Sequence, residues 1–265
     1  MSNSPSEPLY DNIGVHYDST RRADPYLTER LAHHIGLQSG RSYLDIACGT
    51  GNYTSVLAAA GGSWHGLDVS MGMLGTARRK DGSLRLVRGD AAAMPFTDRS
   101  FDGIVCTMAL HHLPHLEPVF SEALRVLRRG NLVIFASTRD QVATYWLNEY
   151  FPVAMAQSTE QMPTTASVID ALEQSGFLVE EVEIYEVQPD LQDLFLYAGK
   201  RKPELYLDET VRRGMSTFST LIDPVELETG CARLRQDVES GHINEVIESY
   251  LSNEGDYLFV VASRP

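Results

Sequence analysis

The sequence has few cysteines, no long apolar run and no N-terminal targeting pattern. Its three cysteines, Cys48, Cys106 and Cys231, lack CxxC or other metal-type spacing, which argues against a disulfide framework and a zinc site, so we expect no metal. No stretch approaches the roughly 18 consecutive apolar residues of a membrane helix. The start, MSNSPSEPLYDN, lacks the basic and apolar segments of a signal peptide. We therefore expect a cytoplasmic chain without a membrane partner.

Positive charge is also scarce. The 265 residues include 22 Lys and Arg against 36 Asp and Glu, a formal net charge of -14. No basic run is longer than Arg78 to Lys80, so repulsion would oppose binding to a phosphate backbone and we expect no nucleic-acid partner. With 43% hydrophobic residues, the chain can bury one substantial core, with an added subdomain.

Short apolar runs alternate with helical patterns in the first half of the chain. Five runs are typical of buried strands: 43–47, 64–69, 84–87, 103–107 and 132–136. Between the last two, apolar residues at i, i+3 and i+4 spacing predict a helix over His115–Arg128. This alternation predicts an α/β fold, with a parallel sheet covered on both faces by helices.

The second half of the chain does not follow this alternation of strands and helices. We expect a helix over 165–174, a strand over 179–187 and a final strand over 257–262, with a mostly helical insertion, 188–255, between the two strands. The insertion could cap the site and select the ligand. Its replacement by a short Gly/Ser linker should then preserve cofactor affinity within a few-fold but abolish turnover. The alternative is a dimerisation arm, which would make a homodimer. The predicted division is an N-terminal helical segment (1–40), a core (41–187, with 139–165 partly cap), the cap (188–255) and the closing antiparallel strand (256–265).

The stretch LDIACGTGNYT, Leu44–Thr54, places a glycine turn between a strand and a helix. Such a turn lets a ligand approach the backbone and the free N–H groups of the helix. A dinucleotide site would require GxGxxG, but no third glycine follows Gly51. Asp45 would repel a pyrophosphate, whereas it could hold an ammonium group directly or through water. A nicotinamide-dependent oxidoreductase is therefore disfavoured.

Residues 45–51, DIACGTG, resemble the first motif of class I S-adenosylmethionine (SAM)-dependent methyltransferases, with Ala47 in place of the first glycine. The runs GLDVSMGMLGTAR (66–78), RGDAAAMPFTDRSFDGIV (88–105) and CTMALHHLPHL (106–116) resemble the later motifs, in the family's order. The resemblance implies a Rossmann-like, seven-stranded, mostly parallel sheet, with Asp68 on the ribose hydroxyls and Asp90 on the adenine amino group. The residues that it implies for cofactor binding are Asp45, Ala47, Gly49, Gly51, Asp68, Val69, Met73, Asp90, Ala91 and Met108. The Asp68 carboxylate could instead cap a helix.

The segment LYDNIGVHYDSTRRADP (9–25) is similar to the N-terminal segment of the ubiquinone/menaquinone-biosynthesis methyltransferases, with Gly14 where alanine is usual. In such enzymes this segment folds over the cofactor. The resemblance makes Tyr17, Arg21 and Arg22 candidates for the methionine end of SAM. The alternative is an exposed helix with solvated arginines.

Methyl transfer requires alignment and exclusion of water, and it needs a base only when the acceptor holds its proton tightly. His111 and His112, after the fourth strand, are the candidate bases, although such a pair could simply shape the pocket. The aromatic cluster Tyr145, Trp146, Tyr150 and Phe151 could line an acceptor pocket or form core.

The predicted function is methylation of O, C or N on a small, partly apolar metabolite. The alternative is a SAM-binding protein that does not methylate, either cyclase-like or regulatory.

Overall fold

The computed structural model describes residue 18 and residues 20–265 of the chain. A seven-stranded sheet has the order β3-β2-β1-β4-β5-β7-β6, in which β7 is antiparallel to both neighbours and the other pairs are parallel. The strands are β1 (Ser42–Ile46), β2 (Ser63–Asp68), β3 (Arg85–Arg88), β4 (Gly103–Thr107), β5 (Asn131–Ala136), β6 (Leu178–Tyr185) and β7 (Tyr257–Ser263). The expected α/β, Rossmann-like sheet is confirmed.

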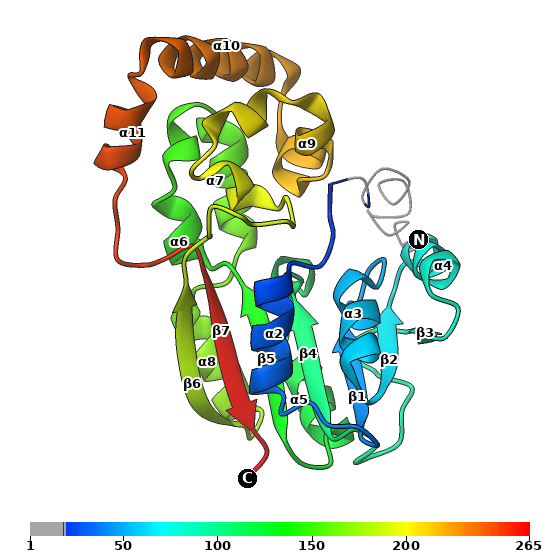
Figure 1. Cartoon of the computed structure of the whole chain (residues 1–265). Coiled ribbons are helices and arrows are strands. Elements are labelled where there is room, and N and C mark those ends of the chain that lie inside the picture. The colour runs from blue at the N-terminus through cyan, green and yellow to red at the C-terminus, as the bar shows by residue number, and fades with distance from the viewer. Residues whose placement is uncertain (1–17, 19) are drawn as a thin grey trace, which may run out of the picture.

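Side chains of the central strands alternate between two apolar cores. In β5, Val133 and Phe135 point into one core, whereas Leu132 and Ile134 point into the other. The helices α2 (Pro25–His34) and α3 (Asn52–Ala60) cover the first face, and α5 (Leu116–Val126) and α8 (Thr165–Gln174) cover the second. The helix α4 (Met71–Lys80) packs against β2 and β3. Figure 1 shows the resulting three layers.

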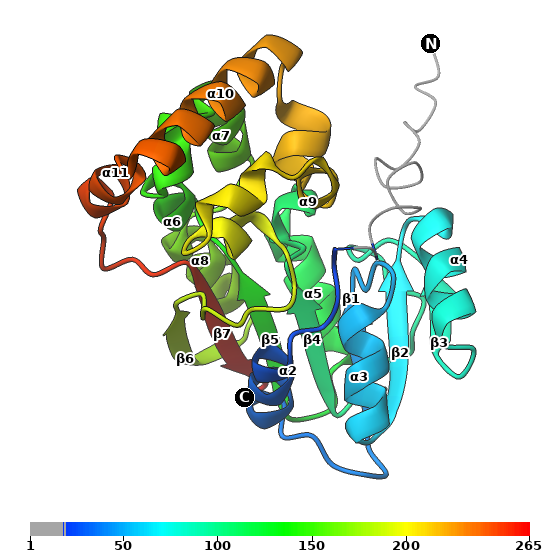
Figure 2. The same cartoon turned by 45° about the horizontal axis from the view of Figure 1, so that its top comes forward.

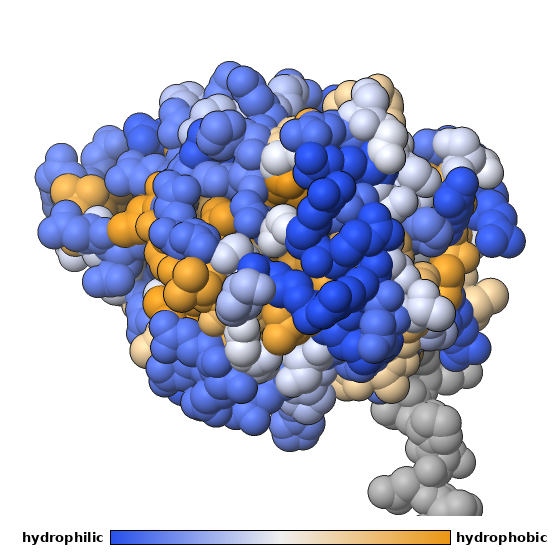
Figure 3. Space-filling view, turned by 90° about the horizontal axis from the view of Figure 1, so that it is seen from below, coloured by the Kyte–Doolittle hydropathy of each residue, from blue (hydrophilic) through white to orange (hydrophobic). Residues whose placement is uncertain are grey.

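The two outer strands are less buried than the central ones. The run 84–87 was expected to be a buried strand, but β3 pairs only with β2, at the sheet edge, and both of its terminal arginines are exposed. The other edge strand, β6, exposes Leu178 and Ile184 at 55% and 56%. Seen from below, the molecule is mostly hydrophilic with apolar areas between the polar ones (Figure 3). The predicted homodimer stays a prediction.

A helical cap lies above the carboxyl ends of the parallel strands (Figures 1 and 2). Its first part follows β5 and consists of α6 (Arg139–Ala143), η3 (Trp146–Glu149) and α7 (Pro152–Gln161). Its second part, between β6 and β7, consists of η4 (Leu196–Gly199), η5 (Pro203–Leu207), α9 (Glu209–Arg213), η6 (Thr217–Leu221), α10 (Pro224–Ser240) and α11 (Ile243–Ser249). None of the helices in the described part of the chain has the length and apolar character needed to cross a bilayer.

Aromatic side chains join the cap to the sheet. Tyr145 of the first cap part stacks on Tyr197 of the second, with ring centroids 3.9 Å apart, and Phe195 lies 4.7 Å from Tyr257 of β7. These rings belong to the same buried core as Phe135 of β5. The aromatic cluster 145–151 is therefore core: its four aromatic residues are at most 3% exposed.

Candidate functional site

A cavity of about 630 Å³ lies between the carboxyl edge of the sheet and the cap. This volume is within the range of about 300–1,000 Å³ that is usual for small-molecule sites. Its wall begins at the glycine turn after β1, continues along the ends of β2 and β4, and reaches α7 and residues 193–217 of the cap. Ligands of open α/β sheets bind at this edge, because there the chain leaves each parallel strand for a helix.

The two glycines of the turn have different roles. Gly49 has φ +55°, and a Cβ on it would meet nothing within 4 Å, so its missing side chain leaves space at the cavity. Gly51 has φ +71°, but its Cβ would lie 3.3 Å from Ala77 of α4, and Gly51 does not line the cavity. Ala47 also has a positive φ, +55°, which is uncommon for alanine. The turn is therefore shaped by close packing on one side and by open space on the other.

Asp68, the last residue of β2, holds this turn in place. Its Oδ2 accepts a hydrogen bond from the Gly49 backbone N–H at 2.8 Å, and its Oδ1 accepts one from Ser70 N–H at 2.8 Å. The N-cap of α4 is Ser70, whose hydroxyl accepts from Met73 N–H at 3.2 Å, so Asp68 is not the capping residue. Asp68 also lines the cavity, and a carboxylate has about four lone-pair positions with which it can accept hydrogen bonds.

Asp45, the fourth residue of β1, is a buried carboxyl group at the cavity wall. It is 3% exposed, and its Oδ2 accepts from the Thr54 hydroxyl at 2.5 Å. Burial raises the pKa of Asp45 to about 7, although the Thr54 hydrogen bond lowers it and the Asp68 charge raises it further. Near neutral pH this carboxyl group is therefore poised between its two states, and a ligand cation would favour the ionised one.

Asp90 and Ala91 follow the short strand β3. Both line the cavity, and Asp90 Oδ1 accepts from the Ala92 N–H at 2.9 Å. The Asp90 side chain is otherwise exposed. It can accept further hydrogen bonds at the rim of the cavity.

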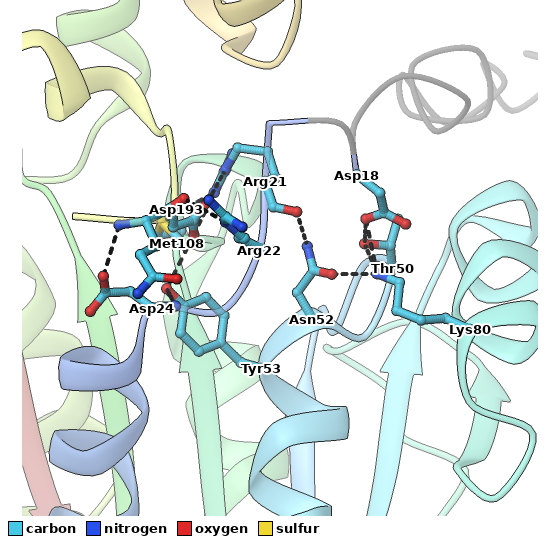
Figure 4. Close-up of polar contacts among 11 residues, drawn as sticks. Asp18, Arg21, Arg22, Asp24, Thr50, Asn52, Tyr53, Lys80, Met108 and Asp193 are labelled. Atoms are coloured by element: carbon cyan, nitrogen blue, oxygen red, sulfur yellow. Dashed lines mark hydrogen bonds and ion pairs between the residues drawn. The ribbon is translucent and has the colours of Figure 1, made fainter. Parts of the chain in front are cut away.

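The segment just before α2 contributes Arg21 to the cavity wall and contacts the cap. Arg21 Nε donates to Asp193 Oδ1 at 2.6 Å, and the Tyr53 hydroxyl donates to Asp193 Oδ2 at 3.1 Å (Figure 4). Arg21 Nη2 also lies 3.4 Å from the sulfur of Met108, whose φ is +53°. Arg21 and Asp193 are 8% and 1% exposed, so the ion pair is buried. Arg22, in contrast, is exposed and donates to the Gln192 carbonyl at 3.4 Å.

A second set of polar contacts joins the same segment to the turn and α4 (Figure 4). Asp18 Oδ1 accepts from the Thr50 hydroxyl at 2.7 Å and lies 2.9 Å from Lys80 Nζ. Asn52 donates to the Arg21 carbonyl at 2.9 Å and accepts from Lys80. The glycine turn, α3, α4 and the cap therefore all contact residue 18 or residues 20–24.

The two histidines lie in the turn η2 (Leu110–His112), which follows β4. Both line the cavity, and their ring centroids are 3.7 Å apart. Burial lowers the pKa of His111 well below 6.5, and the charges of His112 and Arg21 lower it further. His112 is exposed and lines the cavity, and desolvation by the surrounding protein lowers its pKa to about 4. At pH 7 both rings are neutral, so they can accept a proton but are weaker bases than an ordinary histidine.

The cavity brings together most of the residues expected at the site. The predicted residues that line it are Asp45, Ala47, Gly49, Asp68, Val69, Met73, Asp90, Ala91, Met108, His111 and His112. Arg22 and Gly51 do not line it, because Arg22 points outward and Gly51 packs on α4. Tyr17 lies outside the described residues. The sequence did not predict Asp193, because the insertion carries no recognisable motif. It did not predict Tyr53 either, because its position in the sequence indicates only that it belongs to a helix.

The charge of the wall indicates the kind of ligand that fits. Four aspartates, Asp45, Asp68, Asp90 and Asp193, and one arginine, Arg21, line the described part of the cavity. Arg21 is paired with Asp193. The remaining charge is negative, which suits a cationic ligand and opposes a pyrophosphate. The open Gly49 backbone, the acceptor capacity of Asp68 and the buried carboxyl group of Asp45 fit SAM, which carries an ammonium and a sulfonium.

Comparisons with known proteins agree with this geometry. A family described as "Methyltransferase domain" matches residues 44–135. The demethylmenaquinone methyltransferase of Staphylococcus aureus (strain MRSA252) is 32% identical over 49% of this chain and 58% of its own length. The demethylmenaquinone methyltransferase of Shouchella clausii (strain KSM-K16) is 30% identical over 63% of this chain and 73% of its own length. The chain thus spans between half and three quarters of these two relatives.

Solved structures extend the likeness to the cap. A "Putative methyltransferase from antibiotic biosynthesis pathway" of Anabaena variabilis ATCC 29413 is 30% identical, with a TM-score of 0.82 over 91% of this chain and 98% of its own. The [4+2]-cyclase SpnF, 16% identical with a TM-score of 0.64 over 100% of this chain and 99% of its own, shares the fold. The chain belongs to the class I SAM-dependent methyltransferases of the ubiquinone/menaquinone type, and SAM is its cofactor.

Proposed function

We propose that this chain methylates O, C or N of a small, partly apolar acceptor bound beneath the cap. The observation that supports the proposal is that one cavity extends from Asp68 and Gly49 to Phe195 and Met215 of the cap. A ligand at the turn and a second ligand under the cap would therefore share one cavity. Such an arrangement favours alignment of two reactants.

We assign the cofactor contacts by their chemistry. Asp68 accepts from the ribose hydroxyls, Asp90 from the adenine amino group, and Asp45 faces the ammonium of the methionine end. Arg21 replaces Arg22 as the arginine nearest that end, because Arg21 lines the cavity and Arg22 is exposed. Bound SAM supplies an electrophilic methyl group. His111 and His112 are neutral at pH 7 and so can accept a proton from an acceptor that must lose one.

Conversion of SAM to S-adenosylhomocysteine (SAH) tests this function. The purified chain would be incubated with SAM and a panel of neutral aromatic, phenolic and ketone acceptors. The panel includes demethylmenaquinone, the molecule for which two relatives are named. We expect SAH release that depends on an acceptor and that is at least about tenfold slower in Asp68→Ala at SAM concentrations below saturation. The exposed Asp170→Ala, on α8, is the matched control.

Two results would contradict the proposal. Failure to bind SAH would remove the cofactor assignment. Tight SAH binding without methyl transfer to any acceptor would favour a SAM-binding protein that does not methylate.

A further inference from the structure

Two hydroxyl groups meet in the cap wall of the cavity. The Thr217 hydroxyl donates to Ser158 Oγ at 3.1 Å, and the residues are 2% and 3% exposed. Ser158 lies in α7 and Thr217 begins the π-helical turn η6, so the two cap parts contribute one residue each. Both residues line the cavity. Single π-helical turns are frequent at functional sites.

This pair has hydrogen-bonding capacity to spare. Two hydroxyl groups carry two protons, and the bond between them uses one. No acceptor among the described residues takes the other, although a helical serine often donates to the carbonyl four residues earlier. A buried hydroxyl donor without an acceptor is costly, so an oxygen atom of a ligand in the cavity would satisfy it.

The surrounding wall is uncharged. Apart from Asp193, which pairs with Arg21, the cap residues that line the cavity carry no charge. Phe195, Leu196 and Met215 supply apolar surface to the same cavity. A carboxylate or phosphate on the acceptor would lose its hydration there without gaining a countercharge.

We propose that Ser158 and Thr217 select the acceptor by donating a hydrogen bond to an uncharged oxygen, such as a ketone or quinone carbonyl or a hydroxyl. The apolar part of the acceptor then packs on Phe195, Leu196 and Met215. This inference rests on the proposed function, because it assigns the cap side of the cavity to the methyl acceptor. It identifies the acceptor class as neutral, largely apolar and oxygenated.

Three matched probes test the selection in protein saturated with SAH, by calorimetry or equilibrium dialysis. The probes are 2-acetylnaphthalene, its isostere 2-isopropenylnaphthalene, which has CH₂ in place of the oxygen, and 2-naphthoate, which is charged. We expect the ketone to bind roughly three- to tenfold more tightly than the alkene, as one neutral hydrogen bond allows. The carboxylate should bind at least about tenfold more weakly than the ketone.

Variants assign this preference to the hydroxyl pair. In the double variant Ser158→Ala/Thr217→Val, the ketone-to-alkene ratio should fall to within about twofold while alkene affinity is kept. Thr159→Val is the matched control, because the Thr159 hydroxyl donates to the Met155 carbonyl of its own helix and does not line the cavity. Unchanged SAH affinity and melting temperature would show that the variants are folded.

Each adverse result has a distinct meaning. Equal affinity for ketone and alkene, no binding of the ketone, or a ratio unchanged in the double variant would overturn this inference. If SAH binding and methyl transfer persist in that case, the proposed function stands. A chain that fails to bind SAH would refute the proposed function itself.

Discussion

At the scale of single residues, Asp68 connects the glycine turn to the cavity. Its carboxylate accepts from Gly49 and Ser70 while facing the cavity, so it orients the turn and offers acceptors to a ligand. We expect Asp68→Ala to weaken SAH binding by about 1.5–3 kcal/mol, the usual cost of losing charge-assisted hydrogen bonds. Calorimetric titration measures this loss of SAH affinity, with Asp170→Ala as the control. Unchanged affinity would exclude the ribose assignment.

Asp45 gives cofactor binding a predicted pH dependence. Its pKa is raised to about 7, so the free protein loses this proton between pH 6 and 8. Pairing with the ammonium of SAH lowers the pKa in the complex, and binding therefore releases the proton. Linkage then makes affinity rise with pH, by up to about tenfold between pH 6 and 8. His111 and His112 stay neutral in this range and add no slope.

The comparison that isolates Asp45 is the Asp45→Asn variant. We expect weaker SAH binding with no pH dependence between pH 6 and 8, because the amide has no proton to release. Calorimetry in two buffers of different ionisation enthalpy would count the protons. If the wild-type affinity is flat across this range, Asp45 does not pair with the amino group.

At the scale of elements, the segment 20–24 and the insertion are joined through Asp193. This carboxylate accepts from Arg21 and Tyr53, and Asp193→Asn would remove a negative charge that pairs with the buried Arg21 guanidinium. We expect Asp193→Asn to destabilise the protein by about 3 kcal/mol or more. The double variant Arg21→Met/Asp193→Asn should be less destabilised, because both charges of the buried pair are then removed. Urea unfolding measures both.

Asp190→Asn is the matched control for this pair. Asp190 lies three positions earlier in the same connection and is exposed, so its loss should change stability by less than about 0.5 kcal/mol. Equal, small effects for Asp190 and Asp193 would mean that the ion pair does not hold the segment in solution.

Local patterns predicted the elements well and the contacts between distant elements poorly. The strand 103–107 and the helix 165–174 match the observed bounds, because each has a regular apolar period. The apolar pattern does not indicate which strands lie at the edge of the sheet, so β3 was expected to be buried. Periodicity also could not separate Arg21 from Arg22: which arginine turns inward depends on Asp193, 172 residues away. The Ser158 and Thr217 pair likewise arises from packing of α7 on η6.

At the scale of the whole molecule, one core joins sheet, α2 and cap. Phe135 and Phe259 of the sheet share it with Tyr206, Phe218 and other residues of the insertion. The expectation that a Gly/Ser linker could replace residues 188–255 without loss of SAM binding is therefore revised. Removal would expose the aromatic face that these strands share with the cap, at a cost of about 1.5–3 kcal/mol for each large side chain.

We predict that cap and sheet unfold together. Differential scanning calorimetry should give a single transition whose calorimetric and van't Hoff enthalpies agree, and SAH should move the entire transition upward. The linker variant should fail to bind SAH and should lose the near-ultraviolet circular dichroism of its packed aromatic residues. Point variants such as Ser158→Ala, in contrast, should keep both. Two separate transitions, of which SAH shifts only one, would show that the cap is an independent unit after all, and the linker variant should then bind SAH normally.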